Sequence, residues 1–124
     1  MKVLIAGSAG QLGRALQAST PAAATILAPA EADFDILDAD RVRAALAAHR
    51  PDLVINAAAY TAVDKAESEP DRAEAVNGTA AGTLAPAAAD QGARFVHVST
   101  DFVFDGRSPD PIPPDATPAP LGVY

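Results

Sequence analysis

The stretch KVLIAGSAGQLG, residues 2–13, decides the expected fold. Residues 2–6 are a short apolar run rich in β-branched side chains, which predicts a buried strand. Gly7, Gly10 and Gly13 follow at intervals of three residues, at the head of an expected helix. Glycines in this position allow a tight turn, a close approach of the backbone to a pyrophosphate, and close packing of the helix on the sheet. The stretch therefore predicts a strand–turn–helix unit whose main-chain N–H groups bind the diphosphate of a dinucleotide.

Strands and helices alternate along the rest of the chain. Further strands are expected at 25–28, 53–55 and 94–98, with helices at 11–19, between Asp38 and His49, and between Ser68 and Gly92. This order implies right-handed crossovers and a parallel sheet with helices on both faces. We expect an α/β fold, a Rossmann-like doubly wound parallel sheet. The chain holds the first half only, with about four strands and three crossover helices.

Local signals mark the ends of the expected elements. Asp38 is typical of an N-cap, and Ser68 with Asp71 three residues later resembles a capping box. Pro86 lies inside the last helix and is expected to kink it. Beyond Asp101 the chain is rich in proline and has no periodicity, which predicts a long surface loop.

Composition limits the classes of function. The 124 residues carry a formal net charge of −7, which argues against a surface for nucleic acid or for an anionic membrane. Because the chain has no Cys, it has no disulfide, no thiolate ligand and no cysteine nucleophile. No apolar run reaches the roughly 18 residues of a membrane span, and Gly7 interrupts the first run too early for a signal peptide. We expect a cytoplasmic protein with no metal site and with no nucleic acid or membrane partner.

The adenosine end of a dinucleotide falls near the second strand in this fold. An acidic residue is expected about 20 residues after the glycines, where it binds the ribose 2′-hydroxyl. Residues 28–30 offer neither an acid nor an arginine, and Asp33 and Asp35 follow a few residues later. Asp35 is either a contact to the adenine end or a solvated loop acid. The choice between NAD and NADP therefore stays open.

Two further segments follow strands at the edge where such a sheet binds its ligands. Residues 56–61 come after the third strand and residues 99–101 after the fourth. The small side chains at 57–59 let a ribose and a nicotinamide lie against the backbone, and tight packing of an alanine-rich protein is the alternative. His97, inside the fourth strand, is expected to be buried with its hydrogen bonds satisfied. The charged residues at 64–69 are interpreted as a solvated helix face.

Two long segments resemble a known family. Residues 54–67 (VINAAAYTAVDKAE) and 96–106 (VHVSTDFVFDG) are similar to the corresponding stretches of the dTDP-4-dehydrorhamnose reductases, which are extended short-chain dehydrogenases/reductases. Residues 118–124 (PAPLGVY) resemble the approach to the Tyr-x-x-x-Lys pair of that family, and the glycine motif fits as well. The resemblance covers essentially the whole chain, and the two long segments are specific.

The resemblance implies an NAD(P)H-dependent oxidoreductase that reduces the 4-keto group of dTDP-4-dehydro-L-rhamnose to give dTDP-L-rhamnose, with NADPH or NADH as cofactor. It implies that Tyr124 is the catalytic tyrosine and that Thr100 is its catalytic hydroxyl partner. The substrate contacts would be Thr100, Asp101 and Tyr124. From the glycine motif and the resemblance together, the expected cofactor-binding residues are Gly7, Gly10, Gln11, Leu12, Gly13, Asp35, Ile36, Ala57, Ala58, Ala59, Tyr60 and Thr61.

The lysine that this family carries four residues after its tyrosine is not in the sequence, which stops at Tyr124. A phenol, with a pKa of about 10, needs such a cation to donate its proton near neutral pH. We therefore expect residues 1–124 to be the N-terminal part of an NAD(P)-binding Rossmann domain, with the C-terminal remainder and the substrate domain absent, and to have no measurable reductase activity. The full-length protein would take a nucleotide-sugar substrate, with a homodimer as a candidate assembly.

Two other functions stay open beside the reductase. One is a regulatory subunit that binds the dinucleotide without turnover, since the β subunit of methionine adenosyltransferase resembles this family. The other is another sugar-nucleotide enzyme, a 4-epimerase or a 4,6-dehydratase. Those enzymes more often carry a Ser-Ser or Ser-Thr pair followed by an Ala-Val-Tyr-Gly-like sequence, where this chain has DFVF at 101–104. We rank the reductase first.

Overall fold

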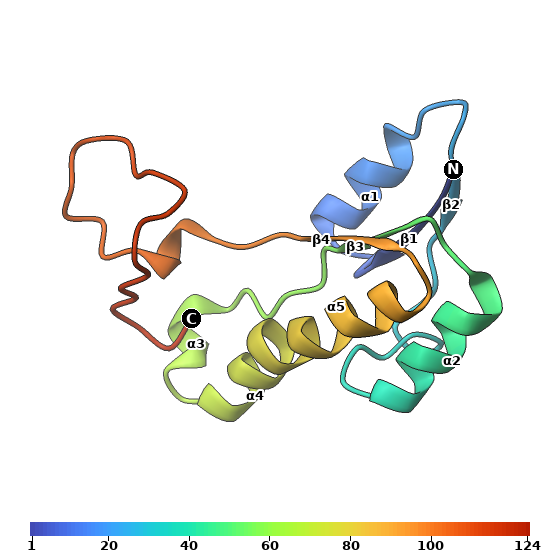
Figure 1. Ribbon diagram of the computed structural model, residues 1–124. Helices are drawn as coiled ribbons and strands as arrows, with labels where there is room; N and C mark the ends of the chain where they lie inside the picture. Colours follow the sequence, from blue (N-terminus) through green and yellow to red (C-terminus); the bar gives the residue numbers. More distant parts are fainter.

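The computed structural model describes all residues 1–124 and contains one four-stranded parallel sheet. Its strands are β1 (Lys2–Ala6), β2 (Thr25–Leu27), β3 (Leu53–Asn56) and β4 (Arg94–His97), in the spatial order β2-β1-β3-β4. Helix α1 (Gln11–Ala18) lies on one face of the sheet, and α2 (Ala39–His49) and α5 (Ala80–Asp90) lie on the other (Figure 1). The predicted Rossmann-like α/β architecture is confirmed.

The strand predicted at residues 2–6 lies inside the sheet. Leu4 is paired with Leu27 on one side and with Val54 on the other, so both edges of β1 are hydrogen-bonded. Each residue from Val3 to Ala6 is at most 4% exposed. A strand with both faces covered is apolar throughout rather than alternating, which is why this run has no polar positions.

The main core lies between the sheet and the pair formed by α2 and α5. Its 12 buried residues include Leu4 and Val54 from the sheet, Leu46 from α2 and Leu84 from α5. Burial of each of these side chains contributes about 2 kcal/mol. The opposite face is covered less closely, because α1 is alone there and its buried residue is Gly13 (Figure 1).

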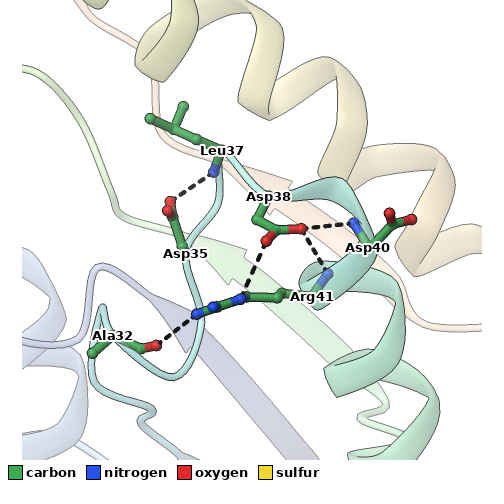
Figure 2. Close-up of polar contacts among 6 residues, drawn as sticks. All are labelled: Ala32, Asp35, Leu37, Asp38, Asp40 and Arg41. Carbon is green, nitrogen blue, oxygen red and sulfur yellow. Dashed lines mark hydrogen bonds and ion pairs between the residues drawn. The ribbon is translucent and has the colours of Figure 1, made fainter.

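Asp38 is the N-cap of helix α2, as predicted. One carboxylate oxygen of Asp38 accepts the N–H of Asp40 at 3.1 Å and that of Arg41 at 3.0 Å (Figure 2). Asp40 in the first turn and His49 in the last turn both suit the helix dipole. Arg50 caps the C-terminal end of the helix in a left-handed conformation, with a φ of 46°.

The third crossover contains a short helix, α3 (Val63–Ala66), followed by one continuous helical stretch that matches the helix predicted between Ser68 and Gly92. That stretch consists of α4 (Pro70–Glu74), a π-helical turn η1 (Ala75–Thr79) and α5. The capping box predicted at Ser68 is wrong, because the Ser68 hydroxyl donates to the Lys65 carbonyl at 2.9 Å and so closes α3. Helix α4 begins at Pro70, which has no N–H to cap. Pro86 lies inside α5, which continues past it to Asp90.

Strand β4 is an edge of the sheet, since it pairs with β3 alone. His97 in this strand is exposed, so its predicted burial is wrong, although its Nδ1 does have a partner in Asn56 Nδ2 at 3.1 Å. A short 3-10 turn, η2 (Asp101–Val103), leads into the predicted proline-rich surface loop. The loop returns to the body of the molecule, and the C-terminus lies beside α3 (Figure 1).

None of the helices combines the length and the hydropathy that a bilayer crossing requires.

Candidate functional site

A cavity of about 820 Å³ opens at the carboxyl ends of the strands. The β1–α1 turn, the segments that follow β2, β3 and β4, and the region of α4 and η1 all contribute to its wall, together with the C-terminal residues. An open parallel sheet binds its ligands at this edge, outside the carboxyl ends of the strands. The cavity is therefore the candidate site.

Glycine is required at two positions of the β1–α1 turn. Gly7 has a φ of +74°, and a Cβ there would lie 2.5 Å from the Ala58 nitrogen. A Cβ on Gly13 would meet the Gly7 carbonyl and would lie 2.7 Å from Ser8 Cα. Gly10 is less restricted, since its Cβ would be 3.2 Å from the Gly7 oxygen, whose carbonyl accepts the Gly10 N–H. The turn is thus too tightly packed for side chains at its first and last glycines.

The same turn leaves an anion-binding helix end open. Helix α1 begins at Gln11, and its N-cap Gly10 has no side chain to bond the N–H groups of the first turn. Gly7, Gly10, Gln11 and Leu12 line the cavity. Gly13 lies behind the wall, where it lets α1 approach the turn. Backbone N–H groups and the helix dipole at this point favour a bound phosphate.

Two side chains that the sequence did not single out hold the turn in place. The Ser8 hydroxyl donates to the Pro29 carbonyl at 2.8 Å, which ties the turn to the end of β2. Gln17 Nε2 donates to the carbonyls of Ser8 at 2.8 Å and Gly13 at 3.0 Å. Polar residues at these places have no local pattern that distinguishes them from surface residues.

The segment after β3 lies directly against the glycine turn. Asn56 is fully buried, and its Oδ1 accepts the Ala58 N–H at 3.1 Å, which turns the backbone across the cavity. All five residues predicted here line the cavity: Ala57, Ala58, Ala59, Tyr60 and Thr61. The side chains at 57–59 are small for two reasons. Ala58 packs against Gly7, and larger side chains would fill the cavity.

Tyr60 is the centre of a charged cluster. Its hydroxyl donates to one carboxylate oxygen of Glu69 at 2.8 Å, while Lys65 Nζ lies 2.7 Å from the other. The Arg72 guanidinium is 5.8 Å from the centre of the Tyr60 ring, within the range of a cation–π contact. Two of the charged residues interpreted as a solvated helix face, Lys65 and Glu69, therefore belong to this cluster.

The cluster changes the protonation of its members. Desolvation, the hydrogen bond to Glu69 and its charge together raise the pKa of the Tyr60 phenol. The hydrogen bonds from Lys65 and Tyr60 lower the pKa of Glu69. The hydrogen bond to Glu69 raises the pKa of Lys65. At neutral pH, Tyr60 is therefore a neutral donor to an ionised Glu69.

Asn77 in the π-helical turn fixes the backbone of Tyr60. Its Oδ1 accepts the Tyr60 N–H at 2.8 Å, and its Nδ2 donates to the Tyr60 carbonyl at 3.0 Å. Single π-helical turns are frequent at functional sites. Asn77 and Arg72, which both line the cavity, were missed by the sequence analysis. Neither carries a local signal in the sequence, because the role of each depends on its contact with Tyr60 in the fold.

The predicted catalytic pair lies on the same cavity. Thr100 and Tyr124 both line it. The Thr100 hydroxyl accepts the Phe102 N–H at 3.2 Å and donates to Asp101 Oδ1 at 3.3 Å. The Tyr124 ring packs edge-on against Phe102, with the ring centres 5.5 Å apart.

Glu67 holds a residue of the cavity wall, whereas Asp101 lies outside that wall. Glu67 accepts the Val123 N–H at 2.8 Å and so holds the residue before Tyr124. Asp101 is exposed and lies outside the cavity wall, whereas Asp35 and Ile36 at the β2 end are part of it. The structure thus brings the predicted site residues together except for Gly13, which packs behind the turn, and Asp101.

The sheet order, the glycine turn and the cavity define a Rossmann-like α/β domain. Residues 1–124 match the model of the family described as "RmlD substrate binding domain", and the chain belongs to that family.

Curated relatives agree with this assignment. The chain is 40% identical over 124 residues to the dTDP-4-dehydrorhamnose reductase of Sinorhizobium fredii, which covers 100% of this chain and 42% of that protein. The dTDP-4-dehydrorhamnose reductase of Escherichia coli is 41% identical over 129 residues, covering 100% of this chain and 43% of that protein. The chain therefore spans about two-fifths of the length of these relatives. The resemblance inferred from residues 54–67 and 96–106 is confirmed.

Solved structures extend the likeness to three dimensions. The dTDP-4-dehydrorhamnose reductase of Bacillus anthracis in complex with NADP has a TM-score of 0.95 and 37% identity, covering 99% of this chain and 44% of that chain. The reductase of Clostridium acetobutylicum also has a TM-score of 0.95, at 38% identity, and covers 100% of this chain and 45% of that chain. A 4-epimerase of Campylobacter jejuni is 19% identical with a TM-score of 0.85, which shows the fold alone.

Proposed function

We propose that the cavity binds NADPH or NADH and that the chain is the cofactor-binding part of a reductase that converts dTDP-4-dehydro-L-rhamnose to dTDP-L-rhamnose. The observation that supports this most directly is the meeting of the glycine turn, the segment 57–61 and the pair Thr100 and Tyr124 on one cavity. The relatives named above carry this reductase name at about 40% identity over the whole chain.

The residues on the cavity divide into three groups by the part of the dinucleotide that they would hold. The N–H groups around Gly10 and Gln11 would hold the diphosphate, with Asp35 and Ile36 toward the adenine and residues 57–61 toward the nicotinamide. The bound dinucleotide would supply a hydride to the substrate ketone. Asn77 would keep Tyr60 and its neighbours in the position that this binding needs, since it bonds both backbone polar groups of Tyr60.

Reduction of a ketone leaves negative charge on its oxygen, so a proton donor must lie beside that oxygen. Tyr124 is the proposed donor, and the Thr100 hydroxyl is the proposed second hydrogen-bond donor to the same oxygen. Thr100 now donates to Asp101 at 3.3 Å, which is long for an O–H···O hydrogen bond, so little is lost when the hydroxyl turns to a substrate. The proposed location is the cytoplasm, and a homodimer is the assembly to test first.

Cofactor binding is tested by calorimetric titration of the 124-residue chain with NADH and with NADPH. Gln11→Glu places a carboxylate at the N-terminus of α1, where it suits the helix dipole but repels the diphosphate. We expect this variant to bind about tenfold more weakly without losing thermal stability. Gln91→Glu, the same change at the exposed end of α5, is the control and should bind like the wild type. Failure of both dinucleotides to bind the wild-type chain would refute the proposal.

Substrate binding needs a separate measurement. Saturation-transfer NMR with a dTDP-linked sugar, in the presence of the oxidised dinucleotide, should detect contact with the wild-type chain. Thr100→Val keeps the shape of the side chain but removes its hydroxyl, and we expect it to weaken that signal. Equal signals from the wild-type chain and from Thr100→Val would contradict the role proposed for the Thr100 hydroxyl.

A further inference from the structure

The C-terminal segment, residues 118–124, is tied to the rest of the molecule from two different parts of the chain. The Ala119 N–H donates to the Val103 carbonyl at 2.8 Å, and the Tyr124 ring packs edge-on against Phe102, so both contacts come from the η2 turn after β4. The other contact comes from the crossover after β3, where Glu67 accepts the Val123 N–H at 2.8 Å across 56 residues of sequence. The side chain of Glu67 therefore joins two segments that are distant in the chain.

Glu67 is not engaged with the charged residues beside it. It follows α3 directly, and its neighbours Lys65 and Glu69 pair with each other at 2.7 Å. Glu67 belongs to none of the four ion pairs of the chain, and it is not part of the cavity wall. Its carboxylate is thus committed to the C-terminal segment rather than to the cluster around Tyr60.

The backbone of the C-terminal segment is shaped to receive this carboxylate. A Cβ on Gly122 would lie 2.8 Å from Glu67 Oε1, the same oxygen that accepts the Val123 N–H. Gly122 therefore leaves the space that lets the carboxylate reach the next residue. The close approach and the hydrogen bond are separate observations, and they meet on one atom.

The residues held by this contact are on the cavity wall. Val123 and Tyr124 both line the cavity, on the same wall as Thr100. The aromatic contact alone restrains Tyr124 weakly, because Phe102 is itself 50% exposed. A hydrogen bond to an ionised acceptor is stronger than a neutral one, so the Glu67 contact is the firmer restraint on the backbone next to Tyr124.

We propose that Glu67 is a positioning residue for the substrate half of the cavity, an inference that rests on the proposed function. By holding the Val123 N–H, Glu67 places the Tyr124 phenol beside the ketone oxygen of a nucleotide sugar. Glu67 takes no part in binding the dinucleotide, whose diphosphate is assigned to the glycine turn at the opposite side of the sheet edge. Loss of the contact therefore weakens binding of the sugar nucleotide and spares the dinucleotide.

Two titrations of the 124-residue chain test this division: NADH by calorimetry, and dTDP-L-rhamnose by saturation-transfer NMR in the presence of the oxidised dinucleotide. Glu67→Ala should bind the sugar nucleotide about fivefold more weakly, with NADH affinity kept within about twofold. Glu67→Gln retains a carbonyl oxygen as acceptor and should restore most of the loss. Asp64→Ala, which removes an exposed carboxylate from the same helix α3, is the matched control and should bind both ligands like the wild type.

Gly122→Ala tests the same contact from the other side. Its Cβ displaces the Glu67 carboxylate, so the variant should show a similar loss and should add little to Glu67→Ala in a double-mutant cycle. Hydrogen exchange at the Val123 amide, followed by NMR, should be faster in both single variants than in the wild type.

The outcomes separate this role from a structural one and from the proposed function. An equal loss of NADH and of sugar-nucleotide binding in Glu67→Ala would show that Glu67 supports the fold alone. Unchanged sugar-nucleotide affinity, with faster exchange at Val123, would show that the contact exists but does not position Tyr124 for the ligand. Absence of dTDP-L-rhamnose binding by the wild-type chain would overturn the substrate part of the proposed function and this role with it.

Discussion

Gly13 determines how closely α1 approaches the turn before it. A Cβ at this position would lie 2.7 Å from Ser8 Cα and would also meet the Gly7 carbonyl, and neither backbone atom can move without opening the turn. Gly13→Ala is therefore expected to lower the free energy of unfolding by about 3 kcal/mol, the upper part of the range for overpacking. Urea denaturation followed by circular dichroism measures this loss.

Gly82→Ala is the matched control for that substitution. Gly82 is an exposed residue of α5, and a Cβ there has no neighbour within 4 Å. Alanine at an exposed helical position is expected to stabilise the chain by about 0.5 to 1 kcal/mol. Opposite signs for the two substitutions would support the packing argument, and equal losses at both positions would contradict it.

The Lys65–Glu69–Tyr60 cluster predicts a pH dependence of stability. Glu69 has a lowered pKa in the fold, so its contribution is present above its unfolded pKa of about 4.3 and is lost as the pH falls through the lower folded value. Lys65 and Tyr60 have raised pKa values, so their contributions are present below about pH 10 and are lost as the pH rises further.

Glu69→Gln tests this dependence. The difference in unfolding free energy between the wild type and the variant should stay constant from about pH 5 to pH 10 and should shrink outside that window. Chemical denaturation at a series of pH values measures it. A double-mutant cycle with Lys65→Met shows whether the change in unfolding free energy comes from the Lys65–Glu69 ion pair. A difference that grows below pH 4 would contradict the assignment.

At the residue scale, the sequence predicted the groups that a local pattern marks. The glycines were found because their spacing follows a strand, and Tyr60 and Thr100 because they follow other strands. Arg72 and Asn77 could not be found in this way, since their roles depend on contacts with Tyr60, 12 and 17 residues away in the chain. His97 was placed wrongly because its apolar neighbours in sequence do not reveal that β4 is an edge strand.

At the scale of elements, the π-helical turn η1 is the part of the third crossover that serves the site. It carries Asn77, which makes two hydrogen bonds to the backbone of Tyr60, and these set the path of residues 57–61 along the cavity. Asn77→Leu keeps a similar volume and removes both bonds. We expect it to lower the unfolding free energy by about 2 kcal/mol and to weaken NADH binding more than that loss of stability explains.

The comparison variant is Asn77→Asp, which retains an acceptor for the Tyr60 N–H but loses the donor to its carbonyl. Because its carboxylate faces the Tyr60 carbonyl and adds a negative charge to the cavity wall, its affinity for NADH should also fall below that of the wild type, and part of that loss should be recovered as salt is raised. Calorimetric titration at a temperature where all three proteins are folded measures the order. Wild-type affinity in Asn77→Leu would show that the two bonds do not position the segment.

The elements that the sequence predicted correctly are those marked by a local signal, such as an apolar run or a capping residue. The apolar runs gave all four strands, and the Asp38 cap gave the start of α2. The third crossover was predicted as one helix between Ser68 and Gly92, because its apolar positions continue through the π-helical turn. A π-helical turn adds one residue to the helix without changing the composition, so the periodicity alone does not reveal it.

At the scale of the whole molecule, the cavity is lined by parts of the chain that are not held together by the hydrophobic core. The core packs α2 and α5 against one face of the sheet, whereas the cavity wall takes residues from the ends of all four strands and from Tyr124. A ligand in the cavity would therefore bridge the β1–α1 turn, the β2 end and the C-terminal segment. Binding should stabilise the chain as a unit.

This coupling predicts a thermal shift on saturation with NADH. A ligand at 100 times its dissociation constant adds about 2.7 kcal/mol to the stability of the folded state. For a domain of this size, that gain corresponds to a rise in Tm of roughly 10 °C. Differential scanning calorimetry of the chain with and without NADH measures it.

Nicotinamide mononucleotide is the control ligand for this shift, since it lacks the adenosine that would reach the β2 end. It can contact residues 57–61 but cannot bridge them to Glu31 and Asp35, so its shift at the same concentration should be much smaller. Gly13→Ala, whose turn is distorted, should show a reduced shift with NADH as well. The reduced form of the mononucleotide is used, so that the two ligands differ in the AMP half alone, and equal shifts with both would mean that the β2 end takes no part in binding.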